Sequence, residues 1–215
     1  MEIMEKLVEK LADAITVPLG YDSEQRAVVQ YGLFAVIQIL VVAVIISVFG
    51  IVAGCIWECW ISYLSVAMLR KSTGGAHANT SNECLVISVL VISLIGLISR
   101  YFRLMPHALL IGLVICPVLF FVSCLIVYKK APVDSEKKPI KSAEKIRRLR
   151  LISLVTLIIY ALLAFLLFAV SFNNLIYLSL AVSLNLSVFW QSLTLLMAVK
   201  NKTVVDKNLK KGEQT

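Results

Sequence analysis

The feature that most constrains this chain is the run of residues 27–69, which contains a single acid, Glu58, and no base. A helix crosses a bilayer with about 20 predominantly apolar residues. The run is too long for one crossing, and Gly50 and Gly54 offer a place to turn. The whole chain is also strongly apolar, since 60% of it is hydrophobic, 16% is charged and its mean hydropathy is +0.90. A soluble domain of 215 residues could not bury that much apolar surface, so the sequence predicts a polytopic membrane protein.

The predicted fold class is all-α. Open sheets cannot cross lipid, and the chain lacks the alternation of barrel strands. Residues 1–17 place apolar side chains at helical spacing opposite charged ones, and Pro18 ends the pattern. This segment predicts an amphipathic helix that lies in the membrane interface. We treat residues 1–215 as one integral-membrane domain with a tail at 200–215, and we expect six transmembrane helices, near residues 28–50, 53–69, 84–99, 107–128, 150–171 and 174–199.

The placement of lysine and arginine predicts the side of the membrane on which each loop lies. Residues 129–150 carry nine bases and the tail after residue 199 carries five, whereas the opposite side has two, Arg100 and Arg103. We therefore expect both termini, the 70–83 loop and the basic loop to be cytoplasmic. The net charge of +8 fits attraction to anionic membrane lipid, so no nucleic-acid partner is expected.

The five cysteines, at positions 55, 59, 84, 116 and 124, form no C-x-x-C pair and no zinc spacing. Four of them fall within predicted spans, where a cysteine is an ordinary packing residue. Cys84 differs, because it borders a polar loop on the reducing side, where a thiol stays free. A zinc site on His77 and Cys84 would lack further ligands, since His107 is expected near the opposite membrane face. We expect neither a metal nor a cofactor.

The polar segment "KSTGGAHANTSNEC", residues 71–84, contains the candidate site. Thr80 and Glu83 fit the capping box S/T-x-x-E directly before an apolar run, so a helix is expected to start there. Cys84 then lies in or just beyond the first turn, where unpaired backbone amides favour a thiolate. On one continuous helix, His77 would lie about 10.5 Å from Cys84 along the axis. A break at Thr80, together with Gly74-Gly75, would let His77 fold back over the thiol.

These residues also carry a resemblance. The segment "LRKSTGGAHANTSNEC" resembles the signature of the accessory gene regulator B family, the membrane endopeptidases of bacterial quorum sensing. The N-terminal amphipathic segment, "QYGLF" and "APVDSEKKPI" look like that family in the same order. Phe34 departs from the pattern, because an acid is expected after the Tyr-Gly pair. The resemblance implies a multi-pass protein of the bacterial cell membrane, a homodimer, and a substrate that is a small amphipathic propeptide with an acidic C-terminal tail.

The resemblance also implies a chemistry. Family members cut the C-terminal part from the propeptide and keep the rest as a thioester on a cysteine, from which a thiolactone or lactone ring is released. Carried onto this chain, Cys84 is the nucleophile, His77 is its base, and Arg70 and Gly75 match positions important in the family. Backbone amides near Cys84, or the side chains of Asn79 and Asn82, are candidate oxyanion donors. Asparagine in such a loop is also ordinary turn chemistry.

Other interpretations stay open. From composition alone, a Gly-Gly loop with one His and one Cys is a plain cytoplasmic turn. Glu58 inside a span, with the serines and asparagines of 174–199, would suit a small transporter or channel. An anchor for a signalling partner is a third reading, in which Cys84 is dispensable. For Glu58 itself we favour structural pairing with Arg100 or Arg103. For Arg70, a contact with headgroups or a substrate carboxylate and a purely structural, snorkelling role are both open.

Overall fold

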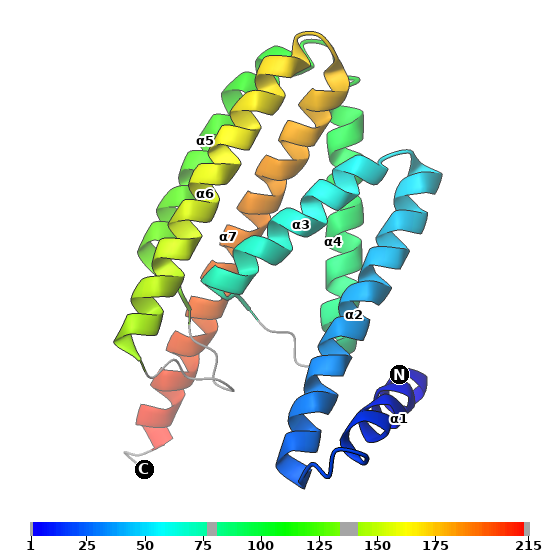
Figure 1. The fold of residues 1–215 in the computed structure, drawn as a ribbon. Coiled ribbons are helices and arrows are strands. Elements are labelled where there is room, and N and C mark those ends of the chain that lie inside the picture. The colour runs from blue at the N-terminus through cyan, green and yellow to red at the C-terminus, as the bar shows by residue number, and fades with distance from the viewer. Residues whose placement is uncertain (1, 77–80, 134–141, 213–215) are drawn as a thin grey trace.

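The structure is a computed structural model and describes residues 2–76, 81–133 and 142–212. These residues form helices and no strand, as the predicted all-α class requires. Figure 1 shows α2 to α7 running alternately up and down, with α1 beside the lower half of α2. The α1 helix and the end of α7 lie toward the lower end. The helices are α1 (Glu2–Thr16), α2 (Ser23–Ala53), α3 (Ile56–Thr73), α4 (Ser81–Phe102), α5 (Ala108–Lys130), α6 (Ala143–Ser171) and α7 (Leu175–Gly212).

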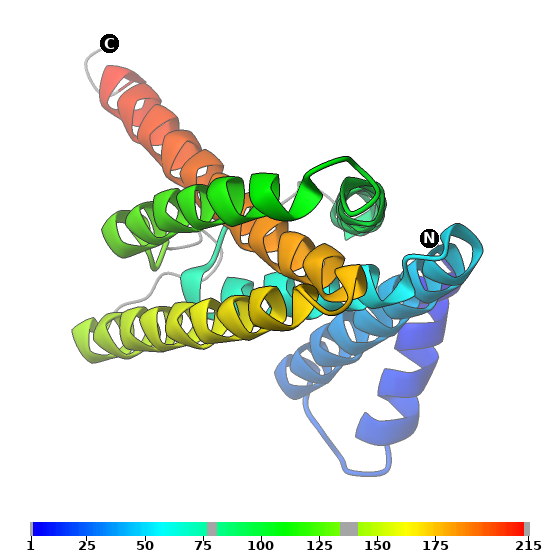
Figure 2. The same cartoon turned by 90° about the horizontal axis from the view of Figure 1, so that it is seen from above.

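The central helix is α7. In its most apolar stretch 56% of the residues are buried, against 17–28% in α2, α4, α5 and α6. It packs against α3, α4, α5 and α6, and the view from above shows it running diagonally between α5 and α6 (Figure 2). The positions of α3, α4, α5 and α6 are therefore set largely by their contacts with α7.

Polarity is distributed in the opposite way to that of a soluble protein. Large apolar side chains cover the outer faces, among them Val44, Val52, Leu90, Val114, Leu162 and Phe165. The buried face of α7 is polar, with Ser179, Ser183, Asn185, Ser187, Gln191, Ser192 and Thr194. Among the described residues, Ser93 is the one buried side chain whose oxygen lacks a hydrogen-bond partner. The interior thus combines hydrogen-bonded polar side chains with apolar ones such as Leu178, Leu184 and Val188, while the exterior is apolar, as a lipid environment requires.

Five helices, α2, α4, α5, α6 and α7, are long and apolar enough to cross a membrane. The helix at the second predicted span, α3, is not among them. It has 18 residues and includes three charged ones, Glu58, Arg70 and Lys71. The multi-pass architecture is thus established at five candidate spans, and a sixth crossing by α3 stays a prediction.

Several predicted boundaries differ from the structure for local reasons. The first span was expected near residue 28, but α2 begins at Ser23, because Asp22 and Gln25 form a reciprocal capping box. The turn expected at the glycines is at Gly54, which ends α2 with φ +66°. Gly50 stays helical and allows α3 to approach, since a Cβ there would lie 2.7 Å from Ile56 Cα. The amphipathic α1 ends at Thr16, and it contacts α2 through an ion pair of 2.6 Å between Asp13 and Arg26.

Candidate functional site

The candidate site has two described parts, the end of α3 with residues 74–76, and the first turn of α4. Residues 77–80 connect them, and His77, Asn79 and the predicted cap Thr80 lie outside the described residues. The structure therefore places Arg70, Gly75, Asn82 and Cys84, and it leaves the predicted His–Cys pair untested.

Cys84 lies in the first helical turns of α4, which begins at Ser81, the residue directly after the predicted cap. Its thiol is free and half-buried. Its backbone carbonyl accepts a hydrogen bond of 2.7 Å from Ser88 Oγ. Asn82 is exposed in the same turn. The thiol is thus accessible at a helix N-terminus, where unpaired amides lie nearby.

The end of α3 is fixed by Arg70. Its Nη2 donates to the carbonyl oxygen of Ala76 at 2.6 Å, so the guanidinium is engaged with the chain's own backbone. The contact of Arg70 with a headgroup or substrate carboxylate stays a prediction. A charged hydrogen bond to a carbonyl, partly buried, holds the loop more firmly than a neutral one.

Residues 74–76 turn away from α3 along a path that requires glycine. Gly74 ends the helix with φ +73°, and a Cβ on it would lie 2.6 Å from Val133 O. Gly75 has φ +156°, and a Cβ on it would meet Thr194 Oγ1 at 3.1 Å. Two successive positive φ angles are a conformation that other residues rarely adopt. The Gly-Gly pair is therefore explained by backbone geometry and close approach to α7.

Two residues of α7 hold this loop. Gln191, fully buried, donates through Nε2 to Gly74 O at 2.7 Å and to Thr73 Oγ1 at 3.0 Å. Thr194 accepts a hydrogen bond of 3.0 Å at its carbonyl from the amide of Ala76. The segment after α5 adds a further bond, from Val133 N to Thr73 O at 3.0 Å. The chain entering the candidate site is thus bonded to three different parts of the fold.

Sequence reasoning missed Gln191 and Thr194. The available signal was their polarity within an otherwise apolar span, and it was read as weak support for a transporter. In the structure the polar residues of α7 serve as helix contacts instead. Ser179, Ser183, Ser187 and Gln191, four residues apart, each hydrogen-bond to α3.

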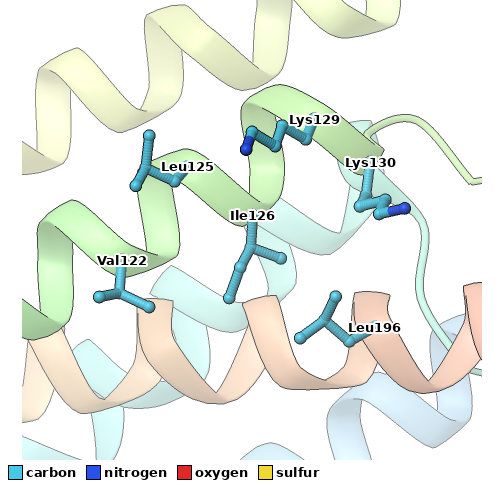
Figure 3. A pocket seen from close by; sticks show the side chains of 6 residues that line it. All are labelled: Val122, Leu125, Ile126, Lys129, Lys130 and Leu196. Atoms are coloured by element: carbon cyan, nitrogen blue, oxygen red, sulfur yellow. The ribbon is translucent and has the colours of Figure 1, made fainter.

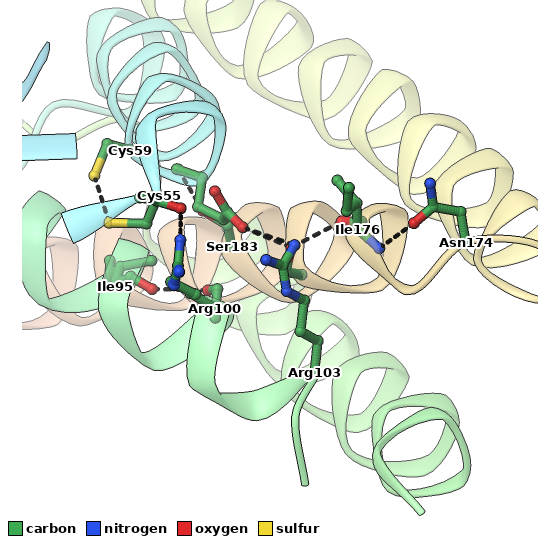
Figure 4. A network of polar contacts seen from close by, with 12 residues as sticks. Cys55, Cys59, Ile95, Arg100, Arg103, Asn174, Ile176 and Ser183 are labelled. Atoms are coloured by element: carbon green, nitrogen blue, oxygen red, sulfur yellow. Dashed lines mark hydrogen bonds and ion pairs between the residues drawn. The ribbon is translucent and has the colours of Figure 1, made fainter. Parts of the chain in front are cut away.

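Glu58 is paired, as predicted. Its carboxylate is 3.8 Å from Arg103 Nη1 and accepts a hydrogen bond of 2.7 Å from Ser179 Oγ. Arg100 donates instead to the carbonyl oxygen of Gly54. Arg100 is in the last turn of α4 and Arg103 directly follows that helix (Figure 4). Glu58 lies in the first turn of α3 and Arg70 in the last, so this cluster is at the opposite end of α3 from the candidate site.

A groove of about 310 Å³ lies between α5 and α7, lined by Val122, Leu125, Ile126, Lys129, Lys130 and Leu196 (Figure 3). It contains none of the predicted site residues. Among the described residues, no three His, Cys, Asp or Glu side chains could share a metal ion. His107 precedes α5, beyond the far end of α4, and α4 alone extends roughly 27 Å from Cys84 to Phe102. His107 is therefore too distant from Cys84 to bind the same metal ion.

The matches among known proteins all indicate the same family. The family model described as "Accessory gene regulator B" matches residues 4–195. The chain is 32% identical over 197 residues to "Putative AgrB-like protein 2" of Clostridium perfringens (strain 13 / Type A), which covers 90% of this chain and 91% of that one. It is 32% identical over 198 residues, with the same coverage, to "Putative AgrB-like protein" of strain SM101 / Type A of the same species. No solved structure matches.

Proposed function

This chain belongs to the accessory gene regulator B family, and we propose that it is a membrane cysteine endopeptidase that processes a quorum-sensing propeptide. The observation that carries the proposal is the free, half-buried thiol of Cys84 at the start of α4, within the matched region. The Gly74-Gly75 loop, which precedes Cys84 in the same polar segment, is held in a defined path by α3 and α7. These two features support a built site over a plain turn.

In the proposed first step, His77 takes the proton of the Cys84 thiol, and the thiolate attacks the scissile carbonyl. The peptide bond breaks as His77 returns the proton to the departing amine. The C-terminal fragment leaves, and the N-terminal part stays attached as a thioester. Amides of the first turn of α4, or the side chains of Asn82 and Asn79, would stabilise the oxyanion.

In the second step, a cysteine or serine within the bound fragment attacks the thioester and frees Cys84. A thioester keeps most of the reactivity of the acyl group, so the exchange needs no nucleotide. Water would instead give a linear product, and a site at the edge of a helix bundle limits its access. We propose as partners an amphipathic propeptide with an acidic tail, membrane lipid and a second copy of the chain.

We further propose six crossings, with both termini and residues 70–83 in the cytoplasm. Support comes from the alternating helix directions and from the excess of lysine and arginine at one end of the bundle (Figure 1). As a crossing helix, α3 would have its polar residues shielded by α7, through Glu58, Ser62 and Thr73. A polar transmembrane helix is tolerated when its polar side faces other helices.

The experiment that tests the proposal follows the covalent step. A propeptide whose ring-forming residue is replaced by alanine allows the first cut and blocks the second. We expect a conjugate of enzyme and N-terminal fragment to accumulate, to be released by neutral hydroxylamine, and to map to Cys84. Cys84→Ala and His77→Ala should each abolish cleavage, and the double variant should lose no more than either. Cleavage in a rapidly quenched reaction without a thiol-linked fragment would contradict the proposal.

A further inference from the structure

Gln191 is a fully buried polar side chain of α7 that contacts the candidate site. It has no solvent exposure, and burying an amide without hydrogen bonds is costly. Both donated bonds go to the loop, one to Gly74 O at 2.7 Å and one to Thr73 Oγ1 at 3.0 Å. Its own oxygen lies 3.2 Å from Thr194 Oγ1, which donates to it. Both hydrogen bonds that the Gln191 side chain donates therefore go to residues 73 and 74.

Thr194 completes the contact one turn further along α7. Its backbone carbonyl accepts from Ala76 N at 3.0 Å, and its hydroxyl lies where a Cβ on Gly75 would press, at 3.1 Å. On the other side, Arg70 holds the carbonyl of the same Ala76 at 2.6 Å. Both backbone groups of Ala76 are thus bonded, one to α7 and one to α3.

Ala76 is directly followed in the sequence by His77. A general base works only within hydrogen-bond reach of the proton that it takes, and a displacement of about 1 Å can cost a hundredfold in rate. The residues that fix Ala76 therefore limit where the base can be.

From this arrangement we propose that Gln191 and Thr194 are positioning residues of the peptidase, which act by fixing the Thr73–Ala76 loop against α7 so that the base meets Cys84. The inference rests on the proposed function. It assigns a role in the reaction to α7, a helix more than 100 residues away in the chain.

The test compares wild type with Gln191→Ala and Gln191→Glu, purified in proteoliposomes. Gln191→Glu keeps the size of the side chain and replaces the donor by an oxygen that faces the Gly74 carbonyl. We expect kcat for propeptide cleavage to fall by about tenfold to a hundredfold in both, with KM within about twofold. Asn185→Ala is the matched control, because this buried amide on α7 donates to Ala181 of its own helix. It should leave kcat within about twofold.

A second readout separates positioning from general loss of structure. The rate at which iodoacetamide alkylates Cys84 is measured against pH in wild type and in His77→Ala, which define two limits. We expect Gln191→Ala and Gln191→Glu to follow the His77→Ala profile, while Asn185→Ala follows wild type. If His77→Ala differs from wild type but the Gln191 variants keep the wild-type profile and kcat, the positioning role is wrong and the peptidase stands. If His77→Ala matches wild type, the peptidase mechanism fails and the inference with it.

Discussion

At the scale of single residues, Gly75 connects the sequence motif to the geometry. Its φ of +156° belongs to a region that is essentially restricted to glycine. Its missing side chain also leaves room for Thr194 Oγ1. Two independent reasons therefore exclude a larger residue, one from the backbone and one from packing.

We predict that Gly75→Ala loses propeptide cleavage by at least about tenfold, because forcing alanine into this conformation costs about 1–3 kcal/mol and shifts the loop. The measurement is cleavage by the purified variant at saturating propeptide. Gly32→Ala is the matched control, since a Cβ there meets nothing within 4 Å and Gly32 is helical. Equal activities of the two variants would show that the path of the loop is unimportant.

The sequence singled out Cys84 by its place at the end of a polar segment, and Arg70 and Gly75 through the family resemblance; their roles in the reaction stay predictions. It could not select Gln191, because the partners Gln191 and Gly74 are 117 positions apart and only the packing of α7 on α3 joins them. Nor did it predict what Arg70 contacts, since a guanidinium at a helix end can serve a headgroup, a substrate or a carbonyl equally well. Local patterns identify chemical groups, and tertiary contacts decide their partners.

At the scale of helices, apolar run length predicted each helix that crosses the bundle but placed several ends wrongly. The amphipathic first turns were the reason. Residues 23–26 of α2 are polar and residues 143–149 of α6 carry four charged side chains; both segments are helical because Asp22 and Ser142 cap them. The fifth span was expected near residue 150, whereas α6 begins at Ala143.

The contact between α3, α4 and α7 gives a prediction about stability. Arg103→Leu leaves the Glu58 carboxylate buried without its ion partner, which costs about 3 kcal/mol. Adding Glu58→Gln should restore most of the loss, because the amide oxygen still accepts from Ser179. Unfolding in mixed micelles of a mild detergent and dodecyl sulfate measures the four free energies. Arg100→Leu is the matched control, because Arg100 donates to Gly54, and Glu58→Gln should not rescue it.

At the scale of the whole molecule, the apolar exterior and the buried polar contacts between α3 and α7 suit a lipid environment. Each buried hydroxyl between α3 and α7 is bonded to the opposite helix or to its own preceding turn. Such bonds are retained when lipid surrounds the bundle, because no water competes for them. The same contacts shield Glu58, and so they make α3, the one predicted span outside the five candidate spans, compatible with a crossing.

The number and direction of crossings can be tested at three exposed positions. We predict that an impermeant maleimide applied to intact cells labels Met105→Cys, in the α4–α5 turn, and spares Lys71→Cys and Glu144→Cys. The reason is the charge asymmetry, since lysine and arginine concentrate beside residues 71 and 144. The parent chain gives the background from its own cysteines, and permeabilised cells confirm that all three positions react. Labelling of Lys71→Cys in intact cells would mean that α3 does not carry the chain inward. The Gly74–Ala76 loop would then lie outside, where no cytoplasmic propeptide could reach Cys84.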